Sequence, residues 1–292
     1  MKDIMIYGLI SSIEYQKARC CAMDLFKKNT EEIKRPLING MLEFEWSEWI
    51  LAKKKELKGN TWAFTNNVMI FIDGQLVGNT KDFLKWAQEN YSYEDFRNEV
   101  LYETLSKEEY ANYFLETKND FVYLDIIQED QKIGRLLIEL FSNQLPKTSE
   151  NFRLLCTGEK GRSEDGSKKL HYKNTLIHRI VPNGWIQGGD IGKGSGNESE
   201  STYGGLFEDE SFQISNTKRG ILGMANNGRH TNGSQFYITL QSTPWMDNKY
   251  VAFGQVVEGS ETLTKLENLT TINERPQKEC KINECGIFKY EF

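Results

Sequence analysis

The sequence of 292 residues carries a net charge of −6, with 38% hydrophobic and 27% charged residues. The length predicts about two domains, and the composition is that of a folded globular chain rather than a disordered one. Acidic and basic residues are interspersed and no apolar run is long enough to span a bilayer, which argues against nucleic-acid and membrane partners.

Residues 1–91 predict an N-terminal domain in which strands and helices alternate. Residues 4–10 are an apolar strand, too short and wrongly flanked for a signal peptide, and apolar residues recur at helical spacing after Ser12. LINGMLEFEWSEWILAKKKELKG predicts a strand and then an amphipathic helix that ends at Gly59. VMIFIDGQLVG predicts a hairpin with an Asp-Gly turn, and TKDFLKWAQENY a helix.

This order, β-α-β-α-β-β-α, resembles the thioredoxin and glutaredoxin fold, above all where FIDGQLVGNTKDFLKW is similar to a glutaredoxin's closing hairpin and helix. The chemistry of that family is missing, because residues 8–12 replace its CxxC turn and Asn66-Asn67 stands where it has a cis-proline. Cys20 and Cys21 lie in the middle of a helix, as packing or surface thiols. We therefore expect a thioredoxin-like, non-redox interaction domain.

Residues 92–118 predict one or two connecting helices. The segment is charged and periodic, with an apolar stripe of Phe96, Val100, Leu101, Leu105, Tyr110 and Phe114. Such a stripe either packs on the domains that the helix joins or forms a surface for a partner.

The pattern changes to short strands and turns in residues 119–292. FVYLDIIQEDQKIGRLLIELF alternates around a polar turn at residues 129–131, which predicts a long hairpin. LPKTSENFRLLCTGEKG predicts a helix with Thr148 or Ser149 near its N-terminal cap, and more short strands and glycine-rich loops follow. Many short strands with few helices favour a closed β-barrel and an α+β chain as a whole.

No pattern for metal, cofactor or nucleophile chemistry is present. The chain has no HExxH, P-loop or Gly-x-Ser-x-Gly motif. The cysteines are odd in number and form no CxxC pair: Cys20, Cys21, Cys156, Cys280 and Cys285. We expect free thiols in a reducing, cytoplasmic compartment, no metal site and no cofactor.

Eight stretches of residues 119–292, in order, resemble the cyclophilins, the peptidyl-prolyl cis-trans isomerase family: FVYLDI, IGRLLIELF, PKTSENFRLLCTGEKG, YKNTLIHRIV, IQGGDI, FEDESF, GILGMANNGRHTNGSQFYITL and VAFGQVVEG. The resemblance implies an eight-stranded antiparallel barrel capped by two helices, rotamase activity in protein folding, and proline-containing protein segments as partners. The whole chain also resembles a divergent two-domain subgroup, the isomerase-like six type. That likeness implies the ciliary axoneme as location and axonemal or microtubule-associated proteins as partners.

Rotation about an X-Pro bond needs no nucleophile, because its barrier of about 18–20 kcal/mol arises from amide resonance. The resemblance assigns Arg179 to donate to the proline nitrogen as it pyramidalises, and Gln187 to orient Arg179. It implies that the peptide and the proline ring are held at Ala225, Asn226, Gln235, Tyr237, Trp245, Met246, Tyr250, Trp185 and Gly184. His178 is expected to be a structural or rim residue rather than a general base, since the reaction transfers no proton.

The proline pocket departs from the family pattern. Gly184 and Trp185 stand where the family has Phe-Met, Tyr237 replaces a phenylalanine, Met246 a leucine and Tyr250 a histidine. The Tyr237 hydroxyl needs a partner in an apolar floor. Trp185 either plugs the pocket, or swings into the space beside Gly184 and rebuilds the wall with weakened turnover, or leaves nearly ordinary catalysis.

Three functions follow from these alternatives. The chain is a working or weakened isomerase, or a module that binds proline-containing or other extended peptides without turnover, or a structural component docked into a microtubule-based assembly through its N-terminal domain. We expect isomerase activity that is weak or absent.

Overall fold

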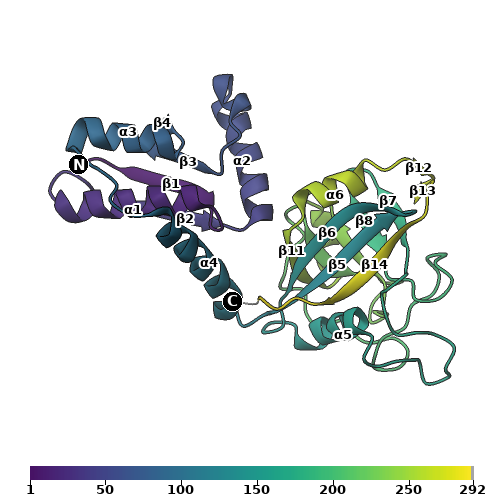
Figure 1. Cartoon of the computed structure of the whole chain (residues 1–292). Coiled ribbons are helices and arrows are strands. Elements are labelled where there is room, and N and C mark those ends of the chain that lie inside the picture. Colours follow the sequence, from purple (N-terminus) through teal and green to yellow (C-terminus); the bar gives the residue numbers. More distant parts are fainter. Residues whose placement is uncertain (291–292) are drawn as a thin grey trace. The chain divides into compact units, whose positions relative to one another are not determined.

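The computed structural model describes residues 1–290 and divides the chain into two compact units, one of residues 1–117 and one that begins at Lys118 (Figure 1). Each unit has its own sheet. Among the described residues, no helix has both the length and the apolar character needed to cross a membrane.

The first unit is built on a four-stranded mixed sheet in the order β2-β1-β3-β4. Strand β2 is parallel to β1, whereas β3 is antiparallel to both of its neighbours. The elements follow the predicted order: β1 (Ile4–Leu9), α1 (Ile13–Lys28), β2 (Leu37–Met41), α2 (Glu43–Leu57), the 3-10 helix η1 (Gly59–Ala63), β3 (Val68–Ile72), β4 (Gln75–Gly78), α3 (Thr80–Tyr91) and α4 (Glu99–Glu116).

Alternation along β1 gives this sheet two different faces. Ile4 and Ile6 are fully buried, and this is the face of β1 that lies against α1. Met5 and Tyr7 point the other way, where Tyr7 stacks on Trp49 of α2 at 4.6 Å between ring centroids. The sheet is therefore covered by helices on both faces, as period-two patterning requires.

Helix α4 packs on α1 with only part of the predicted stripe. Phe96, Val100 and Leu101 are exposed, by 77%, 65% and 41%. The buried side of α4 is formed instead by Tyr102, Ser106, Ala111 and Phe114. Of the predicted stripe, Phe114 is therefore packed within the first unit, whereas the end near Phe96 is exposed.

The second unit is an eight-stranded sheet in the order β14-β5-β6-β11-β9-β10-β8-β7, with every neighbouring pair antiparallel. Its elements are β5 (Asp120–Gln128), β6 (Gln131–Leu140), α5 (Pro146–Thr157), β7 (Ile177–Val181), β8 (Trp185–Gly188), β9 (Ile221–Met224), β10 (Phe236–Thr239), the 3-10 helix η2 (Pro244–Met246), β11 (Ala252–Glu258), α6 (Ser260–Glu267), β12 (Thr271–Ile272), β13 (Arg275–Pro276) and β14 (Cys280–Ile287).

The two edges of this sheet, β14 and β7, come together and nearly close it into a barrel. Leu176 forms an antiparallel bridge with Lys281, and the Ile282 amide donates to the Thr175 carbonyl at 2.9 Å. Helices α5 and α6 lie against opposite ends of the barrel (Figure 1). The eight-stranded antiparallel barrel with two helices is thus confirmed.

The first turn of α5 is capped by a residue distant in sequence rather than by Thr148 or Ser149. Leu145 occupies the cap position and makes no side-chain cap. The Glu210 carboxylate accepts hydrogen bonds from the backbone amides of Lys147 at 3.0 Å and Thr148 at 2.7 Å. A carboxylate at this end of a helix also interacts favourably with the helix dipole.

Candidate functional site

The predicted catalytic residues meet on the outer face of two neighbouring strands. In the β7–β8 ladder Arg179 lies opposite Gln187, and Trp185 lies two residues before Gln187 on the same face. The alternate residues Ile180 and Ile186 are fully buried and point into the barrel. Strand alternation therefore directs Arg179, Trp185 and Gln187 outward together.

Arg179 forms an ion pair that the sequence did not reveal. Its Nε donates to Oε2 of Glu274 at 2.7 Å, and both side chains are about two-fifths exposed, 44% and 41%. The guanidinium also lies over the Trp185 ring, 5.4 Å from the ring centroid. Glu274 belongs to the short turn between β12 and β13, and the only local signal of its position is the Asn-Glu pair in that turn.

Gln187 makes other contacts in place of the expected one with Arg179. Its Oε1 accepts from the Trp185 indole at 3.3 Å, and its Nε2 donates to Oε1 of Gln235 at 3.0 Å. Gln235 in turn donates to the carbonyls of Gly196 and Glu198. Both ends of the Gln187 amide are therefore occupied by the protein itself.

Tyr237, at the predicted floor of the proline pocket, is only 1% exposed. Its hydroxyl donates to Oδ1 of Asn216 at 2.8 Å, so the partner that this oxygen needed is present. A side chain at position 223 would place its Cβ 2.2 Å from that hydroxyl, which means that Gly223 provides the room for it. Burial raises the pKa of Tyr237 far above its usual range.

The neighbours of Tyr237 complete the covering of the floor. Met246 is 3% exposed, and the Tyr250 ring packs edge-on against Tyr237 with centroids 5.9 Å apart. Trp245, in contrast, is 54% exposed. A ligand contacts only accessible surface, so Trp245 is available to a peptide whereas Tyr237 and Met246 are not.

The Trp185 indole lies along β8 rather than beside Gly184. Its N–H reaches Gln187, which is the residue paired with Tyr237 in the β8–β10 ladder. A Cβ at Gly184 would meet Val181 at 3.0 Å, so Val181 already fills that space. Gly184 does not use positive φ; Asn183 before it does, at 55°. This geometry does not support a wall rebuilt in the space beside Gly184.

A cavity of about 210 Å³ lies next to these residues, lined by Gln187, Gly196, Asn197, Ser199, Leu206, Ala225, Asn226, Asn227, Thr231 and Gln235. The Ala225 amide is bonded to the Gln235 carbonyl at 2.9 Å. In the part of the chain that the structure describes, the backbone N–H and C=O of Asn226 make no hydrogen bond. These two groups are free to pair with an extended peptide.

His178 precedes Arg179 but takes no part in this face. It is 7% exposed, and burial lowers the pKa of its imidazole. The neighbouring Arg275 and Arg179 lower the pKa further, against an opposing effect of Asp190. A buried, neutral imidazole fits the structural role predicted for it.

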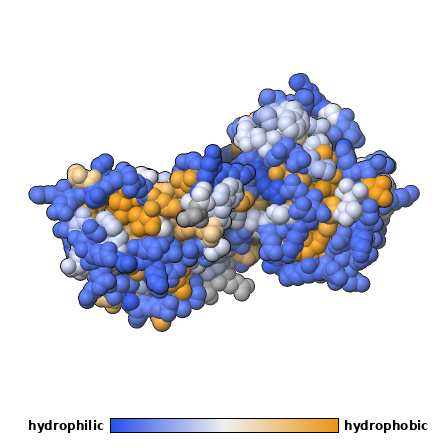
Figure 2. All heavy atoms as spheres, turned by 90° about the horizontal axis from the view of Figure 1, so that it is seen from above, coloured by the Kyte–Doolittle hydropathy of each residue, from blue (hydrophilic) through white to orange (hydrophobic). Residues whose placement is uncertain are grey.

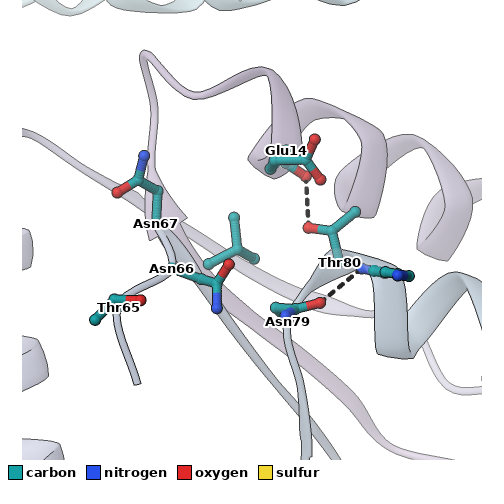
Figure 3. A pocket seen from close by; sticks show the side chains of 8 residues that line it. Glu14, Thr65, Asn66, Asn67, Asn79 and Thr80 are labelled. Carbon is teal, nitrogen blue, oxygen red and sulfur yellow. Dashed lines mark hydrogen bonds between the residues drawn. The ribbon is translucent and has the colours of Figure 1, made fainter. Parts of the chain in front are cut away.

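The first unit contains a second, polar cavity of about 460 Å³ (Figure 3). It lies between the loop before β3 and the start of α3, and is lined by Glu14, Thr65, Asn66, Asn67, Val68, Asn79, Thr80 and Lys81. Thr80 donates to the Glu14 carbonyl at 2.9 Å, and Asn79 caps α3 by accepting from the Lys81 amide. No cysteine is among these lining residues.

The thiols of the chain are free and mostly buried. Burial raises the pKa of Cys21, Cys280 and Cys285 to about 12, which makes them poor nucleophiles. Within residues 1–290, no group of three or more His, Cys, Asp or Glu side chains is arranged to hold a metal ion.

Comparison with known proteins gives a consistent result. The family model "Cyclophilin type peptidyl-prolyl cis-trans isomerase/CLD" matches residues 123–287. A protein named "Probable inactive peptidyl-prolyl cis-trans isomerase-like 6" from Homo sapiens is 47% identical over 97% of this chain and 91% of its own length. Proteins of the same name from Mus musculus and Bos taurus are 48% and 46% identical, over 97% of this chain and 90% and 92% of theirs.

Proposed function

Because the chain belongs to the cyclophilin-type peptidyl-prolyl cis-trans isomerase family, we propose that it binds X-Pro segments of other proteins with isomerase turnover that is weak or absent. The observation that carries this proposal is the covered floor of the proline pocket. Tyr237, at 1% exposure, offers a proline ring no surface to pack on. Isomerisation needs the ring held while the amide twists, so a covered floor impairs turnover.

Groups that can bind a peptide are still accessible. Asn226 lines the cavity of about 210 Å³ with its backbone groups unpaired, and Trp245 is exposed. Backbone pairing contributes affinity for an extended peptide, and an exposed aromatic side chain adds contact area. The names of the three relatives, which include the words "probable inactive", support the weak or absent turnover.

The test is exchange between cis and trans forms of a short X-Pro peptide, measured by NMR on the full chain. We expect the wild type to bind the peptide with little acceleration of exchange, and Trp185→Met to accelerate it by opening the pocket. Adding Arg179→Ala to Trp185→Met removes the gain, which serves as the control for the site. Wild-type exchange that is fast and depends on Arg179 would contradict the plugged pocket.

We further propose that the first unit is a thioredoxin-like docking module that has no redox function. The strand order β2-β1-β3-β4, with β2 parallel to β1, supports this assignment, as does a polar cavity without a thiol. Figure 2 shows hydrophobic surface, in orange, among the polar residues of this unit. Its exposed large side chains include Leu37, Leu51 and Trp62, which suit a protein partner.

The location proposed for this docking is the cytoplasm and its ciliary axoneme, with axonemal or microtubule-associated proteins as partners. The free cysteines agree with a reducing compartment, and the axoneme rests on the subgroup resemblance. Co-sedimentation with isolated axonemes tests it. We expect binding by the full chain that survives Arg179→Ala, and loss of that binding on Arg179→Ala would overturn docking through the first unit.

A further inference from the structure

We propose that Glu274 is a positioning residue that competes with bound peptide for Arg179, and so limits how strongly the groove holds an X-Pro segment. The inference rests on the proposed function. It is carried by the ion pair between Arg179 Nε and Glu274 Oε2 at 2.7 Å, which joins residues 95 positions apart. While Nε is bonded to this carboxylate, that donor is not available to a peptide and the guanidinium is held beside Glu274.

The backbone at Glu274 is unusual for a glutamate. The two residues of the β12–β13 turn, Asn273 and Glu274, have φ values of 48° and 66°, in the left-handed region. Two-residue turns of this kind favour Asn-Gly, because glycine takes positive φ without a steric cost. The backbone alone would therefore favour glycine at position 274, and the contact with Arg179 gives the glutamate side chain a role that glycine lacks.

Backbone contacts keep the carboxylate within reach of Arg179. The amide of Ile180, the residue after Arg179, donates to the Glu274 carbonyl at 2.7 Å. On the other side of the turn, the Arg275 guanidinium donates to the Gly194 carbonyl at 2.8 Å. The turn is thus bonded to β7, the strand that carries Arg179, and this bond holds the Glu274 side chain close to Arg179.

Toward the groove, Arg179 contacts the Trp185 ring, 5.4 Å from the ring centroid, rather than Gln187. Gln187, the side chain opposite it in the ladder, has its Oε1 occupied by the Trp185 indole. The ion pair is about two-fifths exposed, and water weakens such pairs. Removal of the carboxylate should therefore strengthen peptide binding by roughly two- to five-fold rather than by orders of magnitude.

The chain offers a variant that keeps the fold and a matched control. Glu274→Gly creates an Asn-Gly turn, which the backbone prefers. Glu274→Gln keeps the length of the side chain, removes its charge, and should lie between wild type and Glu274→Gly. The control is Glu129→Gly, which also removes a glutamate with positive φ (53°) from a hairpin turn, but one that pairs with Lys278.

Two measurements on the full chain separate this inference from the proposed function. The first is the ¹H–¹⁵N signal of the Arg179 Nε–H group, assigned with Arg179→Ala, which reports the ion pair without any ligand. The second is the Kd of a short X-Pro peptide. We expect Glu274→Gly to shift the Arg179 signal and speed its exchange with water, and to tighten peptide binding two- to five-fold, while Glu129→Gly changes neither.

Each of the other outcomes contradicts either the inference about Glu274 or the proposed function. An Arg179 signal unchanged in Glu274→Gly overturns the inference, and so does a shifted signal with the same peptide Kd. A shifted signal in a chain that binds no peptide, either as wild type or as Trp185→Met, overturns the proposed function while leaving the ion pair in place.

Discussion

The Tyr237 hydroxyl donates a hydrogen bond to Asn216 Oδ1 at 2.8 Å, in a position with almost no solvent exposure. Asn216 is held in turn, because its own side-chain amide donates to Asp247 at 3.0 Å. The floor of the groove is therefore tied to the loop before β9 through Asn216, and the ring of Tyr237 is not free to move aside for a ligand.

The substitution Tyr237→Phe removes the hydrogen bond to Asn216. The buried Asn216 oxygen loses its partner, so we expect a loss of about 1–3 kcal/mol in the free energy of unfolding of the second unit. Urea unfolding measures it. Tyr250→Phe, on the neighbouring and less buried ring, is the control and should cost about 0.5 kcal/mol or less. Equal losses in the two variants would contradict a special role for the Tyr237 hydroxyl.

Gly223→Ala tests the room that the hydroxyl occupies. The new Cβ would lie 2.2 Å from the Tyr237 hydroxyl and 2.3 Å from Cζ, so we expect a loss of about 1–3 kcal/mol from overpacking. In a Tyr237→Phe background the ring is no longer tied to Asn216 and can shift. The double-mutant cycle should then show coupling of more than about 0.5 kcal/mol, and strict additivity would show that the two positions are independent.

His178 should make the stability of the barrel depend on pH. Burial lowers its pKa from the ordinary value of 6.5, so below that pH the unfolded chain binds a proton that the folded chain does not. Stability is therefore complete above pH 6.5 and falls as the pH drops toward the lower folded pKa. His178→Phe should reduce the loss of melting temperature between about pH 7.5 and pH 5.5. His171, whose pKa burial also lowers, leaves a residual slope.

Glu210→Ala should destabilise the second unit through helix α5. The carboxylate is the cap of that helix, so its removal leaves the Lys147 and Thr148 amides without their acceptor. We expect a loss of about 0.5–2 kcal/mol in urea unfolding. Glu208→Ala removes only an exposed pairing with Lys147 and should cost less. A larger effect at Glu208 would show that surface charge, not capping, stabilises this end of α5.

The arrangement of the site was predictable from sequence because it depends on local spacing. Residues 178–187 match the family pattern without gaps, and two antiparallel strands then place Arg179, Trp185 and Gln187 on one face. Glu274 was not predictable in the same way. It lies 95 residues from Arg179, in a hairpin whose strands are too short to show alternation.

Helix α4 shows a second limit of sequence patterns. Val100 and Leu101 of this helix are exposed, as is Phe96 before it. The side toward α1 contains Glu109, which bonds both Gln16 and Arg19 at 2.6 Å. Hydrophobic periodicity finds the packed face of a helix only when that face is apolar. Here part of the contact is polar, so the apolar residues alone do not mark the packed face.

The near-closure of the barrel has a consequence for its motion. Strands β5 and β6 pair along their whole length, whereas β7 and β14 meet through the Leu176–Lys281 bridge and the bonds of the preceding loop to Ile282. Local opening takes place where few backbone bonds must break. In hydrogen exchange, the Ile282 amide should lose protection before the amides between β5 and β6. The second unit then behaves as a curled sheet whose edges β7 and β14 can separate. Strand β7, at this weakly bonded edge, is the strand that carries Arg179.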